Sequence, residues 1–166
     1  MQGFAPGLLD KLLVSRDHKQ SNNTVLRITM EELKDAIARD LEALLNSQKI
    51  FSDDFLKSYP ECSNSIVAYG LDDFAGLSLA NTDDRQFICR SLEKTISRHE
   101  PRLRKVKAML EVQESSINKL NFAISAILVV HPAHEPVSFD AVLQPSSLQY
   151  TINKARRMGR GSTQNG

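Results

Sequence analysis

Three pairs of adjacent aspartates are the first residues whose type could perform chemistry, because a glycosidase needs two carboxylates that flank its substrate. Each pair is contiguous in the sequence and lies beside a turn or a predicted helix start. In that setting, helix capping and solubility explain the carboxylates better than acid–base catalysis does. We therefore predict no catalytic role for these pairs, which are Asp53-Asp54, Asp72-Asp73 and Asp83-Asp84.

Other catalytic, metal-binding and cofactor-binding signatures are missing from the sequence. His131, His134 and Glu135 resemble a metal cluster, but Pro132 interrupts regular geometry there and the sequence places no third ligand. Neither cysteine has a histidine nearby, no G-x-S-x-G elbow is present, and few of the seven glycines remain to form a phosphate loop. The sequence thus predicts no catalytic residue, no metal site and no cofactor.

One short segment, Arg98 to Arg102, places opposite charges beside a proline at a boundary between predicted elements. Glu100 and Arg102 are two positions apart, so in an extended segment their side chains point to the same side. They can pair with each other as a partly exposed ion pair, which contributes little to stability. They can also offer a bidentate contact to a partner across the rigid Pro101. The spacing favours the first interpretation, and both stay open at this point.

The residues before this segment show helical patterning. Thr29 and Glu32 form a capping box, and apolar residues then recur at helical spacing, which predicts a helix from about residue 30 to 47. A polar loop follows. Residues 65–69 are compatible with one short helical turn that ends at Gly70.

A second helix is predicted from the N-cap residues 81–83 to His99, because Pro101 disfavours helical geometry at the preceding residue. From residue 102 onward the apolar period changes from 3.6 to 2, which indicates strands with one wet face. The short links between the apolar runs favour an antiparallel meander. The predicted strands span residues 106–112, 120–130, 137–143 and 148–152.

These elements predict a single α+β domain, with N-terminal helices packed on a C-terminal antiparallel sheet. The strand at 120–130 is apolar on much of both faces and should therefore be central. The links include a loop at 131–136. Because the predicted strands contain no proline, we expect one sheet edge to be left open for a partner strand.

The predicted domain covers residues 29–153 and is flanked by two other segments. The leader, residues 1–28, carries a short amphipathic patch that is either a frayed terminus or a helix that docks on a partner. The docking residues of such a helix would be Leu8, Leu9 and Leu12. Residues 154–166 are basic and are predicted to be disordered.

Charge and composition limit the classes of partner. The chain has 166 residues, a net charge of +1 and 41% hydrophobic residues, which are ordinary values for a globular domain. The tail carries four basic residues and no acidic one, so the rest of the chain is mildly acidic and has no broad basic face for nucleic acid. The longest apolar run is too short to span a bilayer, and the first residues lack the pattern of an export signal. A cytoplasmic location without membrane insertion is therefore expected.

Several stretches occur in a characteristic order along the chain. The leader GLLDKL is followed by ITMEELKDAIARDLEALLNS, SIVAYGLDDFAG, a second helix, the junction HEPRL and the strand pattern KVKAMLEV, LNFAISAIL and PVSFDAVL. This order resembles the TssE-type baseplate subunit of bacterial type VI secretion systems, a relative of the phage-tail wedge protein labelled "lysozyme-like". The resemblance covers roughly residues 4–153. Its most specific parts are RDLEALLN, SIVAYG and Glu100-Pro101-Arg102.

The resemblance implies an α+β fold and a structural baseplate role without catalysis. In this family the Glu-Pro-Arg motif engages the core bundle of the wedge, which TssF and TssG form, and this assigns partner binding here to Glu100, Pro101 and Arg102. Residues 8–13 resemble the family's terminal docking peptide, and TssK is a further candidate partner. The sheet resembles the interlocking domain of the sheath proteins TssB and TssC. The subunit is therefore expected to prime sheath polymerisation by accepting sheath strands at a sheet edge.

Two other function classes compete with this interpretation. The family label suggests a cell-wall hydrolase, but such an enzyme must leave the cytoplasm and needs a paired-carboxylate site. A free-standing module with a nucleic-acid-binding tail is the other alternative, and a salt-dependent shift on DNA would support it.

Overall fold

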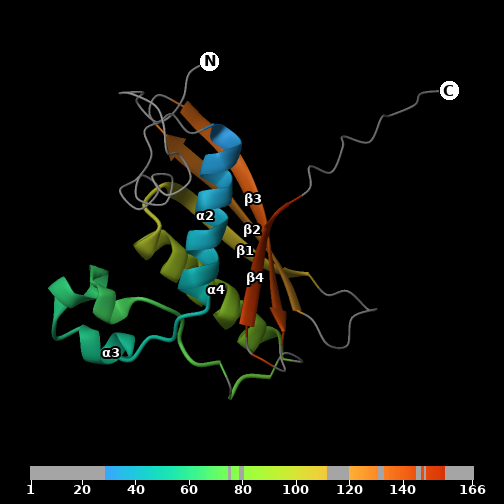
Figure 1. Ribbon diagram of the computed structural model, residues 1–166. Helices are drawn as coiled ribbons and strands as arrows, with labels where there is room; N and C mark the ends of the chain where they lie inside the picture. Colours follow the sequence, from blue (N-terminus) through green and yellow to red (C-terminus); the bar gives the residue numbers. More distant parts are fainter. Residues whose placement is uncertain are drawn as a thin grey trace.

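Two long helices cover one face of a four-stranded antiparallel sheet in the computed structural model (Figure 1). The structure describes residues 29–74, 76–78, 81–111, 120–130, 133–144, 147 and 149–155. In chain order the elements are α2 (Met30–Leu45), α3 (Asp53–Leu56), the 3-10 turns η1 (Pro60–Asn64) and η2 (Ile66–Ala68), α4 (Thr82–His99), β1 (Leu103–Glu111), β2 (Leu120–Val130), β3 (Ala133–Gln144) and β4 (Gln149–Lys154). The predicted α+β class, with helices first and a meander after them, is confirmed. The leader that carries Leu8, Leu9 and Leu12, and the tail from residue 156, lie outside the described residues.

Local capping explains where the long helices begin. The Thr29 side chain accepts from the backbone N–H of Glu32, whose carboxylate accepts in return from the N–H of Thr29 at 2.7 Å, so the predicted capping box is confirmed. Asn81 caps α4 by accepting from the N–H of Asp83 at 3.0 Å.

The helix ends follow from the residues after them. Helix α2 ends at Leu45, two residues before the predicted end, because Asn46 takes the C-cap position and its side chain binds the backbone of Tyr150. Helix α4 ends at His99 as predicted. Pro101 disfavours continuation of the helix beyond that residue.

The sheet is a simple meander in the order β1-β2-β3-β4. Strand β2 pairs with a neighbour on each side, so its predicted central position is confirmed. Strand β1 begins at Leu103, three residues before the predicted start, and a bulge between Arg104 and Lys107 places Lys105 at φ 53°. Lys154, assigned to the tail from the sequence, is the last residue of β4.

The predicted loop at 131–136 is wrong from residue 133 onward, because β3 already includes His134, Glu135 and Pro136. Strand β4 pairs with β3 only from Phe139 to Gln144, so the first half of β3 pairs with no described strand on that side. The Ala155 N–H reaches the carbonyl of Ser138 on that side at 3.0 Å, and Pro136, two residues earlier, faces the same way. Its missing N–H therefore costs the sheet no hydrogen bond.

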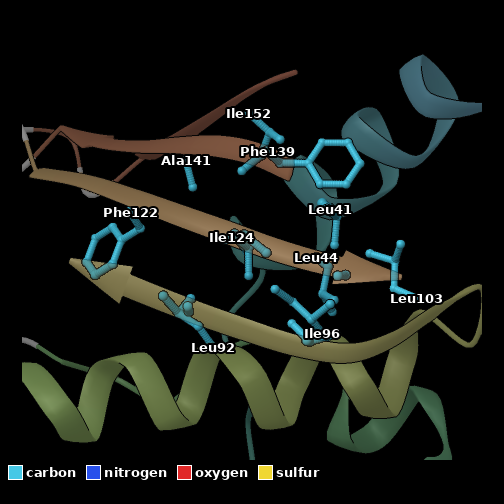
Figure 2. Packing of buried hydrophobic residues seen from close by; sticks show 14 of the residues in the cluster. Leu41, Leu44, Leu92, Ile96, Leu103, Phe122, Ile124, Phe139, Ala141 and Ile152 are labelled. Atoms are coloured by element: carbon cyan, nitrogen blue, oxygen red, sulfur yellow. The ribbon is translucent and has the colours of Figure 1, made fainter. Parts of the chain in front are cut away.

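The core lies between the buried sheet face and the two helices (Figure 2). Strands β2 and β3 contribute its two largest fully buried side chains, Phe122 and Phe139, which are each 1% exposed. Helix α4 packs against β1 and helix α2 against β4. The helical side chains that meet the sheet are spaced three and four residues apart, as the sequence predicted: Leu41 and Leu44 from α2, and Leu92 and Ile96 from α4.

Gly70 lies where the chain between the long helices passes close to the end of α2. Its φ of 112° lies in the region that favours glycine, and the next residue, Leu71, donates its N–H to the Ser47 carbonyl at 2.8 Å. A Cβ at Gly70 would lie 2.5 Å from that carbonyl oxygen. The glycine is thus required by both backbone conformation and space.

We predict that Gly70→Ala lowers the free energy of unfolding by at least about 2 kcal/mol, because the added methyl meets backbone and the φ is unfavourable. Gly76→Ala is the matched control, since a Cβ there meets nothing within 4 Å. Urea denaturation of both variants measures the difference. Equal stability of the two variants would contradict this account.

Candidate functional site

The segment Glu100-Pro101-Arg102 forms the junction between α4 and β1. Glu100 is the C-cap of α4, and its N–H donates to the Ile96 carbonyl at 2.8 Å. Its own carbonyl accepts from the N–H of Leu103, the first residue of β1, at 3.1 Å. The Arg102 carbonyl accepts from Val129 on β2. The chain thus passes from helix to strand within three residues, and Pro101 is exposed at the turn.

The structure brings Glu100 and Arg102 together as a bidentate ion pair. Arg102 Nε donates to Glu100 Oε1 at 2.6 Å, and an Arg102 Nη donates to Glu100 Oε2. The same Nη contacts a carboxylate oxygen of Asp40 on α2, so the guanidinium joins α2, α4 and β1. The hydrogen bond with Glu100 raises the pKa of Arg102 further above its ordinary value.

The sequence suggested that Glu100 and Arg102 form a partly exposed ion pair. This prediction is wrong for Glu100, which is only 5% exposed. Both of its oxygens are occupied by Arg102, because Glu100 lies where the helix end meets the first residues of the sheet. What faces solvent is the rest of the motif: Pro101, part of the Arg102 side chain at 30% exposure, and Asp40 at 55%. Asp40 could not be predicted from the sequence, because its contact with Arg102 joins residues 62 positions apart.

His99, next to the junction, makes contacts that support the fold. His99 Nε2 lies 2.9 Å from the Ala68 carbonyl, and its ring meets Tyr69 edge-on. Burial lowers the pKa of His99, which favours the neutral imidazole. These contacts hold the η2 turn against the end of α4.

The acidic pairs have the positions that the sequence predicted. Asp53-Asp54 and Asp83-Asp84 lie in the first turns of α3 and α4. Asp72 pairs with Lys49 at 2.6 Å and accepts from the Ser91 hydroxyl at 3.0 Å.

Cationic side chains surround the Asp53 carboxylate. Its carboxylate pairs with Lys94, with Lys49 at 3.1 Å and with Arg98 at 3.5 Å. The hydrogen bond from Lys94 lowers the pKa of Asp53 to about 2, which keeps the carboxylate ionised at neutral pH. A general acid needs the opposite shift.

His134 and Glu135, proposed from the sequence to lie in a surface loop, are residues of β3. Glu135 accepts from Lys34 on α2 at 2.7 Å. Among the described residues, no group of three His, Cys, Asp or Glu side chains could hold a metal ion. Within the same residues, no helix is both long and apolar enough to cross a membrane.

Helix side chains occupy the outer edges of the sheet. On β4, Asn46 of α2 donates to the Tyr150 carbonyl at 2.9 Å and accepts from the Tyr150 N–H at 2.7 Å. Two residues on, the Ile152 N–H donates to Glu42 at 2.8 Å.

The edge at β1 is occupied in a similar way by α4. The Ala108 N–H donates to Glu93 at 3.0 Å, and Cys89 and Leu110 line the same groove beside this edge. The expectation of an unguarded edge is therefore wrong for the amides of Ala108, Tyr150 and Ile152, because both helices pack directly over the edge strands.

An exposed aromatic row, which we call the aromatic ridge, was not predicted from the sequence. Phe51, Phe55 and Tyr59 are 38%, 51% and 54% exposed, with neighbouring ring centroids 5.0 and 5.6 Å apart. Ile50 and Ile66 nearby in sequence are at least 80% exposed. The spacing of four residues between the rings was a visible signal, but it does not reveal whether the ridge faces the core or solvent.

A cavity of about 630 Å³ lies where the end of α2 meets the sheet, and its walls include Phe74, Leu120, Leu143 and Tyr150. Tyr150 is 5% exposed, and its hydroxyl has no hydrogen-bond partner among the described residues. Burial raises the pKa of this hydroxyl to about 12. The cavity is apolar on most of these walls and offers no cluster of catalytic groups.

A comparison with models of protein families finds a match. A family model described as baseplate wedge protein gp25 matches residues 31–133, which include both long helices, the Glu100-Pro101-Arg102 junction, β1 and β2. No curated protein matches the chain.

We predict that Arg102→Ala lowers the free energy of unfolding by about 2–4 kcal/mol, because it leaves the buried Glu100 carboxylate without its counter-ion. The double variant Glu100→Ala/Arg102→Ala should lose less than the sum of the two single variants. Chemical denaturation of the three variants measures the coupling. Lys57→Ala, which removes an exposed partner of Asp54, is the control and should leave the midpoint unchanged. Additive losses would show that the pair is not coupled in solution.

Proposed function

The chain belongs to the baseplate wedge protein gp25 family, and on that premise we propose that it links the baseplate wedge of a type VI secretion system to the contractile sheath and primes sheath polymerisation. The observation that carries the proposal is the family match over residues 31–133, which spans the helical layer and the first half of the sheet. The finer assignment to a secretion system rests on the sequence resemblance to TssE-type subunits.

The junction supplies a surface for the wedge partners. Pro101 is exposed, and the charged groups of Arg102 and Asp40 remain partly open to solvent while they hold each other in place. A rigid, partly solvated guanidinium suits recognition of a partner's polar groups. We assign this surface to TssF and TssG, with the buried Glu100 as the residue that orients Arg102.

Two further features fit a protein that works inside an assembly. The aromatic ridge exposes large apolar side chains, which on soluble proteins mark interaction sites when they are contiguous. The leader, through Leu8, Leu9 and Leu12, is proposed as a docking peptide for the same wedge, with TssK as a further candidate partner. The sheath subunits TssB and TssC are the partners proposed for the sheet.

The role proposed is structural, and the place of action is the cytoplasm. The Asp53 carboxylate, whose pKa is lowered to about 2, is held ionised by Lys94, Lys49 and Arg98, which suits an ion-pair cluster and not a general acid. No cofactor, nucleic acid, small-molecule substrate or membrane insertion enters the proposal.

We predict that Arg102→Lys, which keeps the charge but loses the bidentate geometry, weakens capture of TssF and TssG by about tenfold or more, as for a desolvated charge at an interface. Arg39→Lys, at an exposed position of the same helix as Asp40, should change capture little. Both variants are compared with the unchanged chain in affinity capture, with thermal midpoints measured in parallel. If capture falls only in proportion to the unfolded fraction, Arg102 is an internal brace and not an interface residue.

We also predict that the purified full chain does not clear cell-wall suspensions in a turbidity assay. The motivation is the ionised, cation-bound Asp53, the position of Asp83 and Asp84 in the first turn of α4, and the ion pair of Asp72 with Lys49. Clearance that survives repurification and disappears on a single Asp or Glu substitution would overturn the structural role and support the hydrolase.

A further inference from the structure

A β-bulge near the start of β1 exposes two adjacent cationic side chains. Between Arg104 and Lys107 the strand has two residues where β2 has one, Ala126. Burial alternates along β1 except at this point, where Arg104 and Lys105 are both exposed between buried neighbours. Without the extra residue, the alternation of a regular strand would turn Lys105 toward the core. The bulge therefore places two positive charges side by side at the surface.

Lys105 has a backbone conformation that suits glycine better than lysine. Its φ is 53°, and within the described residues no other residue except glycine has a positive φ. This left-handed region brings a Cβ close to the backbone, so a side chain there costs conformational energy that glycine avoids. Backbone strain of this kind is often found where a protein performs its function. The strain at Lys105 thus indicates a use for the lysine outside folding.

The charges of Arg104 and Lys105 are not neutralised within the part of the chain that the structure describes. Neither side chain forms an ion pair there, whereas the nearby Arg102 and Lys107 both contact carboxylates. The sequence outside the basic tail is mildly acidic, so two adjacent cations without counter-ions differ from their surroundings. Solvated cations without partners add little to stability, but they can pair with carboxylates that another protein brings.

The bulge borders the sheet face that the two long helices leave uncovered (Figure 1). Leu103 is buried in the core, so the next residue, Arg104, faces the opposite side of the sheet. Its pair partner on β2 is Ile127, which pairs in turn with Pro136 of β3. Ile127 is partly exposed and Pro136 is exposed. The surface at the bulge therefore combines positive charge with uncharged apolar side chains.

We propose that Arg104 and Lys105 extend the junction surface, and that they bind a carboxylate-bearing segment of the same wedge partner that contacts Arg102. The inference rests on the proposed function for the identity of that partner, the TssF–TssG core. Arg102 and Arg104 are two positions apart, about 7 Å along a strand, so one bound segment reaches both. Its carboxylates pair with the two cations, and an apolar side chain beside them packs on Ile127. The contact is made by side chains and adds no strand to the sheet.

The test measures binding of the full chain to the purified TssF–TssG complex of the same organism. Lys105→Gly should weaken binding by about three- to tenfold, because it removes a charge at the interface. The thermal midpoint of the free variant should stay the same or rise, since glycine suits the backbone at this position. Lys105→Arg keeps the charge and should bind within about twofold of the unchanged chain. Arg104→Glu should weaken binding about tenfold.

Arg90→Glu is the matched control for the charge reversal. Arg90 is exposed, has no ion pair within the described residues, and lies beside residues 108–110 of β1. Four residues of strand separate position 109 from Lys105, about 13 Å, which exceeds the screening length of about 8 Å at physiological salt. Arg90→Glu should therefore change binding little. The salt dependence of the association rate should fall in Lys105→Gly and Arg104→Glu but not in this control.

Two results would overturn the assignment while the wedge-linking function stands: equal effects of Arg104→Glu and Arg90→Glu, or unchanged binding by Lys105→Gly. A lower thermal midpoint for Lys105→Gly would show that the lysine serves folding, and it would overturn the assignment too. Binding of duplex DNA that both bulge variants lose, with TssF–TssG binding intact, would identify nucleic acid as the ligand instead. Absence of TssF–TssG binding to the unchanged chain would reject the proposed function together with this inference.

Discussion

The structure depends on one geometric constraint: two helices must cover the apolar face of a four-stranded sheet. Strands lie about 4.8 Å apart and a helix is about 10 Å wide, so two helices side by side span the sheet from edge to edge. Helix α4 accordingly packs on β1 and α2 packs on β4, while the large rings of Phe122 and Phe139 fill the middle. The contacts between helix side chains and the edge strands follow from this arrangement.

This position lets helix side chains reach the edge backbone. Residues four apart on a helix are separated by about 6 Å, and outward-facing residues on a strand by about 6.8 Å, so one helical turn matches two edge amides. Glu42 and Asn46 meet β4 in this way, and Glu93 meets β1, with Cys89 one turn earlier beside the same strand. Such caps protect edge strands, because bare edges pair with each other.

The junction at the end of α4 must accommodate a buried charge. Glu100 follows the last residue of α4, so its carboxylate is buried at the point where α4, β1 and α2 meet. A buried charge is costly without a partner. Arg102 neutralises it and also reaches Asp40 on the other helix. The same side chain therefore stabilises the fold and presents the charged surface to which we assign the wedge partners. Under that assignment, stability and recognition are coupled at this position through one guanidinium.

Local sequence determined much of this protein: the capping box at Thr29, the cap at Asn81, the end of α4 before Pro101, the change of period that indicates strands, and the family. These signals act over a few residues, because they reflect backbone capping and the alternation of apolar side chains. The tertiary structure decided which charges are buried and which amides are capped. Glu100 is buried, Asp40 reaches Arg102, and Asn46 meets Tyr150 only because packing brings residues 62 and 104 positions apart into contact. Pro136 lies inside a strand for the same reason: a short β4 leaves its side of β3 unpaired, and no local pattern encodes the length of a neighbour.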